Sequence, residues 1–226
     1  MTKRILIVGG VAGGASAAAR LRRLDETAEI VVFDRGPYVS FANCGLPYYV
    51  GDVIRDEKKL LVASAELFRT RFNIDIRTEH EVLSIDRAQR TIAVRDLLRG
   101  TLSTESYDAL VLSPGASAIR PPLPGIELDG IFSVRTIPDS RRVRKWLDDK
   151  HAQRALIIGG GFIGLEMAEN LAHRGLTVTI LEKAGQLMPP LDPEMAEPVR
   201  RQLVQRGVTV RLSEGVTAFA RSPEGL

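Results

Sequence analysis

The sequence has little cysteine and no long apolar run. Cys44 is the only cysteine among 226 residues, so no disulfide can form within the chain. A lone cysteine is typical of a reducing compartment, which favours a cytoplasmic location. No run of about 18 apolar residues occurs, so no membrane span is expected. The chain enters a predicted strand already at residues 4–8, so we expect no signal peptide.

The charges are nearly balanced, and this argues against nucleic-acid binding. Lysine and arginine number 31 and aspartate and glutamate 28, a formal net charge of +3. The arginines are scattered, and no basic block is interleaved with aromatic residues, so no nucleic-acid partner is expected. The three histidines lie in no functional pattern, so we interpret them as surface residues and predict no metal site.

Two stretches repeat one order of strand, turn, helix and strand. In the first, residues 5–8 resemble a buried parallel strand, 9–14 a glycine-rich turn and 15–24 a helix. A second apolar strand at 30–33 ends on Asp34. The same order returns at residues 155–158, 159–164, 165–174 and 177–181, and ends on Glu182. We therefore predict an α/β protein with two Rossmann-like βαβ nucleotide-binding folds, the second inserted after the first.

The residues between the two folds predict other elements. Residues 81–86 and 91–95 alternate in part and flank a polar turn, which is typical of an antiparallel β-hairpin or meander. Residues 107–112 predict a buried strand, and 140–150 a basic surface helix. The predicted domains are 1–118, a connection at 119–150, and 151–226. Because the last has too few strands, we expect the chain to be the N-terminal part of a longer protein.

The glycine turns indicate dinucleotide binding. Gly159, Gly161 and Gly164 hold the positions that permit a tight bend, close approach of a pyrophosphate, and packing of helix on strand. The helix N-terminus then offers N–H groups to phosphates, and Glu182 can accept from ribose hydroxyls. The first turn is less regular, because Val11 replaces the middle glycine. One such turn can occur without a ligand, but two complete units favour dinucleotide binding.

Cys44 is the candidate reactive group. A lone cysteine is usually a small buried hydrophobe, but Asn43 and Gly45 are turn formers and favour a chain reversal here. If Leu46-Pro47 opens a helix, Cys44 lies near its positive end, which favours the thiolate. With no second cysteine, any disulfide must form with an external thiol, or oxidation stops at a sulfenic acid.

Three segments resemble one known family. The block Ser40-Phe41-Ala42-Asn43-Cys44-Gly45-Leu46-Pro47-Tyr48-Tyr49, the first glycine turn and Leu112-Ser113-Pro114-Gly115-Ala116 are similar to coenzyme A-disulfide reductases. The similarity is strongest to forms with a C-terminal rhodanese domain, including NADH-dependent persulfide reductases. It implies FAD in the first fold and NAD(P)H in the second, with Val11 usual in the first turn. It also implies a later FAD-binding segment and a dimerisation domain, hence a homodimer.

The resemblance assigns roles to individual residues. Cys44 would form a mixed disulfide with coenzyme A, whose thiol end Ser40 and Asn43 would hold. Ser16, Arg20 and Arg23 would line the path of the coenzyme, with Arg71 as a further basic residue. Considered without the resemblance, Arg20 and Arg23 fit ordinary cations at a helix C-terminus better than a substrate site.

Further roles concern the two cofactors. Phe162 would cover the nicotinamide pocket and Glu166 would lie near the flavin; core packing and a surface charge are their alternatives. The other expected cofactor-binding residues are Gly9, Val11, Ala12, Gly13, Gly14, Asp34, Arg35, Val82, Ser113, Pro114, Gly115, Gly159, Gly161, Ile163, Gly164 and Glu182.

The function implied is an FAD-dependent NAD(P)H:disulfide oxidoreductase. NADH, favoured over NADPH by Glu182, would supply electrons that reduce a Cys44–S–S–CoA bond, with coenzyme A disulfide, persulfide or polysulfide as substrate. One alternative is an NADH oxidase or peroxidase that cycles Cys44 through sulfenic acid. Those relatives place a histidine in the first turn, where this chain has Ala12. A second alternative is a catalytically incomplete nucleotide-binding fragment.

Overall fold

The structure is a computed structural model that describes residues 2–221. The chain divides into two compact units. Unit 1 comprises Met1–Ala42 and Leu61–Ala116, and unit 2 comprises Asn43–Leu60 and Ser117–Leu226. The segment that carries the cysteine thus belongs to unit 2, although unit 1 precedes and follows it in the chain. The domain limits at 118 and 150 stay a prediction, and residues 222–226 of the last domain lie outside the described residues.

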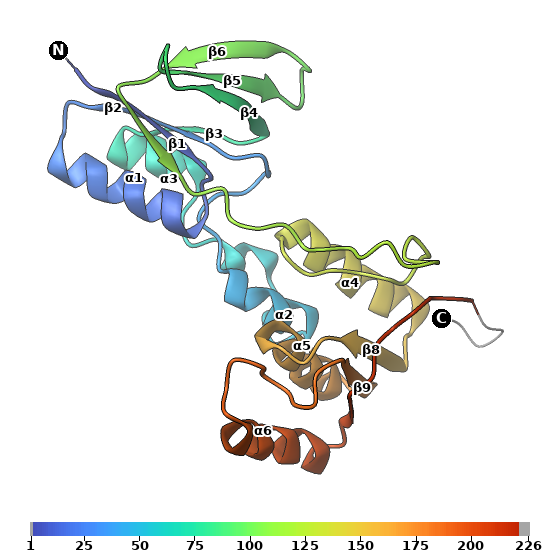
Figure 1. Cartoon of the computed structure of the whole chain (residues 1–226). Coiled ribbons are helices and arrows are strands. Elements are labelled where there is room, and N and C mark those ends of the chain that lie inside the picture. The colour runs from blue at the N-terminus through green and yellow to red at the C-terminus, as the bar shows by residue number, and fades with distance from the viewer. Residues whose placement is uncertain (1, 222–226) are drawn as a thin grey trace. The chain divides into compact units, whose positions relative to one another are not determined.

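Unit 1 is built on a parallel sheet with the strand order β3-β2-β1-β7. One face of this sheet carries two helices, and a separate antiparallel sheet of order β4-β5-β6 covers the other face (Figure 1). The elements are β1 (Arg4–Val8), α1 (Ala12–Leu24), β2 (Glu29–Phe33), α3 (Ala65–Phe72), β3 (Asp75–Arg77), β4 (His80–Asp86), β5 (Thr91–Asp96), β6 (Leu102–Ser106) and β7 (Ala109–Leu112).

The core of unit 1 follows from the alternation of side chains along its central strands. Ile7 and Val32 are fully buried in the cluster that contains the helix residue Ala18. Their neighbours Leu6 and Val31 point to the opposite face and pack in a second cluster with β5. Because both faces are covered, these strands are continuous apolar runs, as expected for parallel strands.

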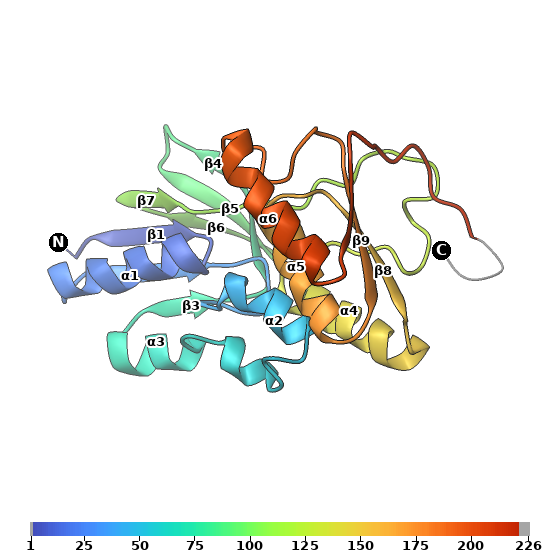
Figure 2. The ribbon, with the colours of Figure 1, turned by 90° about the horizontal axis from the view of Figure 1, so that it is seen from below.

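Unit 2 contains a three-stranded parallel sheet of order β10-β9-β8. Helix α5 packs against β8 and β9 (Figure 2). Helix α6 packs against β10. Val178 and Ile180 of β9 form its core with Leu171 of α5. The elements are the 3-10 helices η1 (Asn43–Gly45) and η2 (Glu57–Leu60), α2 (Leu46–Val50), α4 (Ile137–Lys150), β8 (Arg154–Ile158), α5 (Phe162–His173), β9 (Thr177–Glu182), α6 (Pro193–Gln205) and β10 (Thr209–Leu212).

The predicted fold class is confirmed, including both βαβ units and the antiparallel meander. One expectation is wrong: the strand expected to be buried at 107–112 begins at Ala109, and its Leu112 is 56% exposed. The reason is its position at the edge of the sheet, where β1 is its only partner within the described residues. No helix among residues 2–221 is long and apolar enough to cross a membrane.

Candidate dinucleotide sites and redox cysteine

The two glycine turns are built alike. Gly9 and Gly159 have φ angles of 94° and 104°, a region that side chains rarely adopt. A Cβ atom at Gly14 would lie 1.7 Å from the carbonyl oxygen of Gly9, and one at Gly164 would lie 2.1 Å from that of Gly159. Both helices therefore start in close contact with the turn, a geometry that only glycine permits.

The acidic residue at the end of each second strand is tied to its turn. Asp34 accepts hydrogen bonds from the N–H of Gly10 and of Gly36, both at 2.7 Å. Glu182 accepts from the N–H of Gly160 at 2.6 Å and of Ala184 at 2.7 Å. Each carboxylate oxygen keeps a second lone pair for a ribose hydroxyl. These acids thus fix the turn and remain able to bind a ribose.

The helices that follow the turns start without a side-chain cap. Neither Val11, before α1, nor Gly161, before α5, caps its helix through a side chain. The first N–H groups of each helix are therefore suited to phosphate oxygens. A Cβ at Gly161 would meet no atom of the described residues within 4 Å, which leaves room for a pyrophosphate. Phe162 and Ile163 are 63% and 56% exposed, which excludes core packing as the role of Phe162 within unit 2.

The other residues expected around the flavin divide into two groups. Ser113 lies beside the first turn, because a Cβ at Gly13 would be 3.1 Å from its Oγ and its N–H donates to the Val8 carbonyl at 2.7 Å. Pro114 and Gly115 follow it, and Ala12 opens α1; all three are exposed.

The second group lies by the antiparallel sheet. Val82 packs against the cluster of Leu6 and Phe33, so its side chain contributes to the core of unit 1. Arg35 is 3.7 Å from Glu81. In unit 2, Glu166 is half-buried on α5, and its carbonyl accepts a hydrogen bond from the Asn170 side chain.

Cys44 lies in the 3-10 helix η1 and is exposed. Helix α2 begins two residues later with Pro47 in its first turn, as the sequence predicts. The Oδ1 atom of the neighbouring Asn43 is buried and accepts no hydrogen bond within the described residues. A buried acceptor without a donor costs about 1–3 kcal/mol. Asn43 therefore has an unused acceptor beside an accessible thiol.

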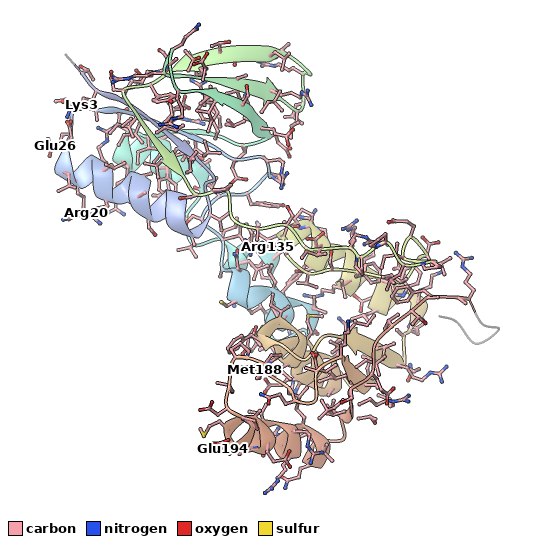
Figure 3. The ribbon with its side chains drawn as sticks, viewed as in Figure 1. Lys3, Arg20, Glu26, Arg135, Met188 and Glu194 are labelled. Atoms are coloured by element: carbon pink, nitrogen blue, oxygen red, sulfur yellow. The ribbon has the colours of Figure 1, made fainter. Side chains whose placement is uncertain are left out.

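The arginines of α1 have two different environments. Arg20 and Arg23 are exposed with Ser16 on the same helix, and Figure 3 shows Arg20 pointing away from the ribbon. Spacings of four and three residues place these three side chains on one helix face. Arg22 is 8% exposed and donates to the carbonyls of Phe72 and Asn73, both at 2.8 Å.

Arg22 therefore has a structural role, whereas the guanidinium groups of Arg20 and Arg23 remain accessible to a ligand. Arg22 connects α1 to the end of α3, a role that sequence inspection missed because all three arginines look alike. Arg71, on α3, is exposed like Arg20 and Arg23. Within residues 2–221, no protein acceptor binds the guanidinium of Arg20, Arg23 or Arg71.

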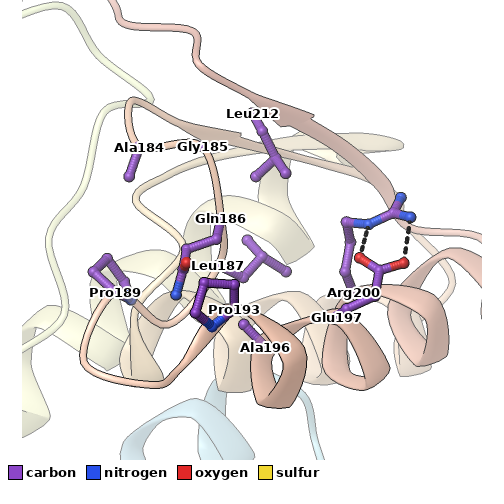
Figure 4. Close-up of a pocket in the computed structure, with 10 residues that line it drawn as sticks. All are labelled: Ala184, Gly185, Gln186, Leu187, Pro189, Pro193, Ala196, Glu197, Arg200 and Leu212. Carbon is purple, nitrogen blue, oxygen red and sulfur yellow. Dashed lines mark hydrogen bonds and ion pairs between the residues drawn. The ribbon is translucent and has the colours of Figure 1, made fainter.

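A cavity of about 600 Å³ lies beyond Glu182 and was not predicted. Figure 4 shows the loop after β9 on one side and α6 on the other. Arg200 forms an ion pair with Glu197 at 2.7 Å, and hydrogen bonds from Arg200 and Arg201 lower the pKa of Glu197 to about 2. The cavity is lined by Ala184, Gly185, Gln186, Leu187, Pro189, Pro193, Ala196, Glu197, Arg200 and Leu212.

One of the three histidines is not a surface residue as expected. His80 is half-buried, its ring lies 6.5 Å from the ring of Phe33, and its Nδ1 is 2.7 Å from the carbonyl of Thr78. It packs at the start of β4, where that strand covers the parallel sheet. Among residues 2–221, no cluster of histidine, cysteine and acidic side chains could hold a metal ion.

Comparison with known proteins identifies the family. Residues 3–226 match the family described as pyridine nucleotide-disulphide oxidoreductase. The chain belongs to this family. Its members use FAD and NAD(P)H, which confirms the predicted cofactors for the family.

Two individual proteins show how similar the chain is to coenzyme A disulfide reductases. The coenzyme A disulfide reductase of Staphylococcus epidermidis is 40% identical over 214 residues, covering 95% of this chain and 48% of that protein. The structure of reduced CoADR-RHD from Bacillus anthracis is 46% identical with a TM-score of 0.95, covering 100% of this chain and 42% of that one.

Two further solved structures are similar. The NAD-dependent persulfide reductase from A. fulgidus is 35% identical with a TM-score of 0.91, over 96% of this chain and 41% of that one. The NADH-bound water-forming NADH oxidase from Lactobacillus brevis is 30% identical with a TM-score of 0.91, over 99% and 49%. The predicted resemblance is confirmed, and the chain spans about half the length of the curated relatives it matches.

Proposed function

We propose that the full-length protein is an FAD-dependent NAD(P)H:disulfide oxidoreductase that reduces coenzyme A disulfide or a coenzyme A persulfide through Cys44. The observation that carries this proposal is the exposed lone thiol beside the unused buried acceptor of Asn43. Two dinucleotide turns in the same chain supply the means of bringing electrons to it. The similar coenzyme A disulfide reductases and the persulfide reductase support the choice of substrate.

The residues of the first turn fit the pyrophosphate and ribose of FAD. Close contacts at Gly9, Gly13 and Gly14 leave no space for side chains, so the backbone itself would form the cradle. Asp34 would accept from the ribose. Ser113, Pro114, Gly115, Arg35 and Val82 would complete this site from unit 1. When bound, the flavin passes two electrons from the nicotinamide to a disulfide.

The second turn fits NADH in the same way. Gly161 gives the pyrophosphate access to the backbone, and Glu182 would accept from the adenosine ribose. In NADPH the 2′ position carries a phosphate, which would face this carboxylate. We therefore propose NADH as the preferred donor, with Phe162, Ile163 and Glu166 at its nicotinamide end.

At the cysteine, the reaction is a thiol–disulfide exchange followed by a two-electron reduction. The Cys44 thiolate attacks one sulfur of coenzyme A disulfide, forms the Cys44–S–S–CoA bond and releases one coenzyme A thiolate. Two electrons then cleave that bond, which regenerates the Cys44 thiolate and releases the second coenzyme A. Asn43 Oδ1 would accept from an amide N–H of the coenzyme near its thiol, and Ser40 would be a second residue for this end of the coenzyme. Arg20, Arg23 and Arg71 would pair with its phosphates.

The test is Cys44→Ser in the flavin-loaded full-length protein. Serine cannot form a mixed disulfide, so NADH oxidation driven by coenzyme A disulfide should cease while the flavin absorption stays unchanged. Near-wild-type turnover in the variant would contradict the proposal. Rapid oxygen consumption by the wild type without any disulfide would instead support an NADH oxidase. A homodimer and a cytoplasmic location also belong to this proposal.

A further inference from the structure

The helix that follows the redox cysteine is too short to hold its own position. Helix α2 has five residues, from Leu46 to Val50, and a helix of this length is not stable alone. Its position must therefore come from packing within unit 2. Val50 is fully buried in the cluster that contains Val143 of α4 and Leu171 of α5. Apolar contact alone, however, permits sliding along a helix surface.

One arginine of α4 fixes the end of α2. Arg144 donates to the carbonyl oxygens of Tyr49, Ile54 and Arg55, each at 3.3 Å, and pairs with Asp52. Its guanidinium carbon lies 4.7 Å from the centre of the Tyr49 ring. The planar guanidinium thus joins the last turn of α2 to the loop after it. A lysine has one ammonium and cannot make this set of contacts together.

Further contacts hold the same segment. Arg174, at the end of α5, donates to the Val50 carbonyl at 2.8 Å and pairs with Asp148. A Cβ atom at Gly51 would lie 2.6 Å from the Cβ of Asn170, so α2 ends in close contact with α5. The N-terminal end of α5 is the second dinucleotide turn. The position of α2 on α5 is therefore set by contacts that tolerate little displacement.

We propose that Arg144 is a positioning residue for Cys44: by fixing α2 on α4 and α5, it holds the thiol in the orientation that disulfide reduction requires. This inference rests on the proposed function of Cys44. Arg144 lies ten residues before the start of β8, the strand that leads into the second turn, and its hydrogen bonds reach no residue assigned to a cofactor. Its loss should therefore affect the disulfide step and leave the reduction of the flavin by NADH unchanged.

The test separates the two half-reactions of the flavin-loaded full-length protein by rapid mixing. Arg144→Gln should slow reoxidation of the reduced protein by coenzyme A disulfide about 10- to 100-fold, because a displacement of about 1 Å at a reacting group costs up to that much. Flavin reduction by NADH should stay within about twofold of the wild type. In the steady state kcat should fall, with the KM for NADH unchanged. Arg144→Lys should recover only part of the rate.

A second variant and a matched control complete the design. Gly51→Ala removes no charge but forces α2 away from Asn170, and it should slow the same half-reaction even if Arg144→Gln does not fold. Lys145→Gln removes a cation from the neighbouring position of α4, whose ammonium pairs with Asp149, and should change neither half-reaction.

Two results would overturn the inference. One is an unchanged disulfide step in Arg144→Gln and Gly51→Ala; the other is equal slowing of both half-reactions. Failure of the proposed function would be recognised separately, because Cys44→Ser would then still reduce the disulfide.

Discussion

Two glycines of the second turn should respond to alanine in opposite ways. Gly164 is needed by the fold, because an added Cβ would be 2.1 Å from the Gly159 carbonyl oxygen. Since nonbonded atoms require about 3.5 Å, the helix would have to move by roughly 1 Å. We expect Gly164→Ala to lower the free energy of unfolding by about 1–3 kcal/mol. The melting temperature should therefore fall.

In the proposed NADH site, Gly161 would be needed by the ligand rather than by the fold. Its φ of −82° and ψ of −177° suit any residue, and a Cβ there would meet no described atom within 4 Å. Alanine should therefore leave the free energy of unfolding unchanged or raise it by about 0.4–1 kcal/mol. The new methyl group would occupy the space of the pyrophosphate, so the Kd for NADH should rise at least about tenfold, equivalent to 1.4 kcal/mol.

The assay pairs thermal unfolding of the flavin-loaded full-length protein with titration of NAD⁺ by calorimetry. Gly161→Ala should separate the two readouts, with normal melting and weak binding, whereas Gly164→Ala should melt early. If Gly161→Ala binds NAD⁺ as tightly as the wild type, the pyrophosphate does not lie against Gly161. If it melts as early as Gly164→Ala, the space around Gly161 is not open and the assignment of the turn is wrong.

Three more outcomes are expected. Arg20→Ala and Arg23→Ala should raise the KM for coenzyme A disulfide more than for a small disulfide without phosphates, by about tenfold each; equal effects on both substrates would make these arginines structural. Glu182→Ala should lower the NADH-to-NADPH ratio of kcat/KM about fivefold, because repulsion between the Glu182 carboxylate and the 2′-phosphate of NADPH costs about 1 kcal/mol. An unchanged ratio would contradict this role of Glu182, and the melting temperature of the variant shows whether the lost contacts to the turn have destabilised the fold. Asp139 closes the capping box of α4. Burial raises the pKa of Asp139, but hydrogen bonds, first of all the one from the Thr136 hydroxyl, lower this pKa below its usual value. This stabilisation is present above the unfolded pKa near 3.9 and is lost as the pH falls through the lower folded value. Asp139→Asn should therefore lower the free energy of unfolding by about 0.5–2 kcal/mol at pH 7 and by less below pH 3.9, compared by urea unfolding; a pH-independent difference would show that the charge is irrelevant.

Both dinucleotide folds could be predicted because their residues depend on local geometry. Gly9 and Gly159 are required by positive φ angles, and Asp34 and Glu182 are placed by strand length. Such requirements involve neighbours in the chain, so they leave a pattern that can be found in one sequence. The start of α2 at Leu46 followed in the same way from the proline after it.

What could not be predicted depends on contacts between distant segments. Arg22 is buried because its guanidinium reaches carbonyls of Phe72 and Asn73, and nothing in the local sequence distinguishes it from Arg20. The assignment of Asn43–Leu60 to unit 2 depends on α4 and α5, which follow about 80 or more residues later. His80 is half-buried for the same kind of reason, since β4 covers a sheet formed by other strands.

The likeness of the two units extends beyond the glycine turns. Ser40 and Met188 both have left-handed φ angles, 47° and 50°, which are uncommon for residues other than glycine. The N–H of each donates to the carbonyl of the second residue of its turn, Gly10 or Gly160, at 2.9 and 2.8 Å.

The residues that precede Ser40 and Met188 also correspond between the two units. Val39 packs over Gly10, and Leu187 packs over Gly160. In both units, therefore, the same backbone hydrogen bond and the same apolar contact hold the loop after the second strand to the glycine turn. In each unit this arrangement requires one residue with a strained backbone. In unit 2 this loop continues to Asp192 and α6. In unit 1 the chain continues from Ser40 only to Ala42, and Cys44, four residues after Ser40, already belongs to unit 2.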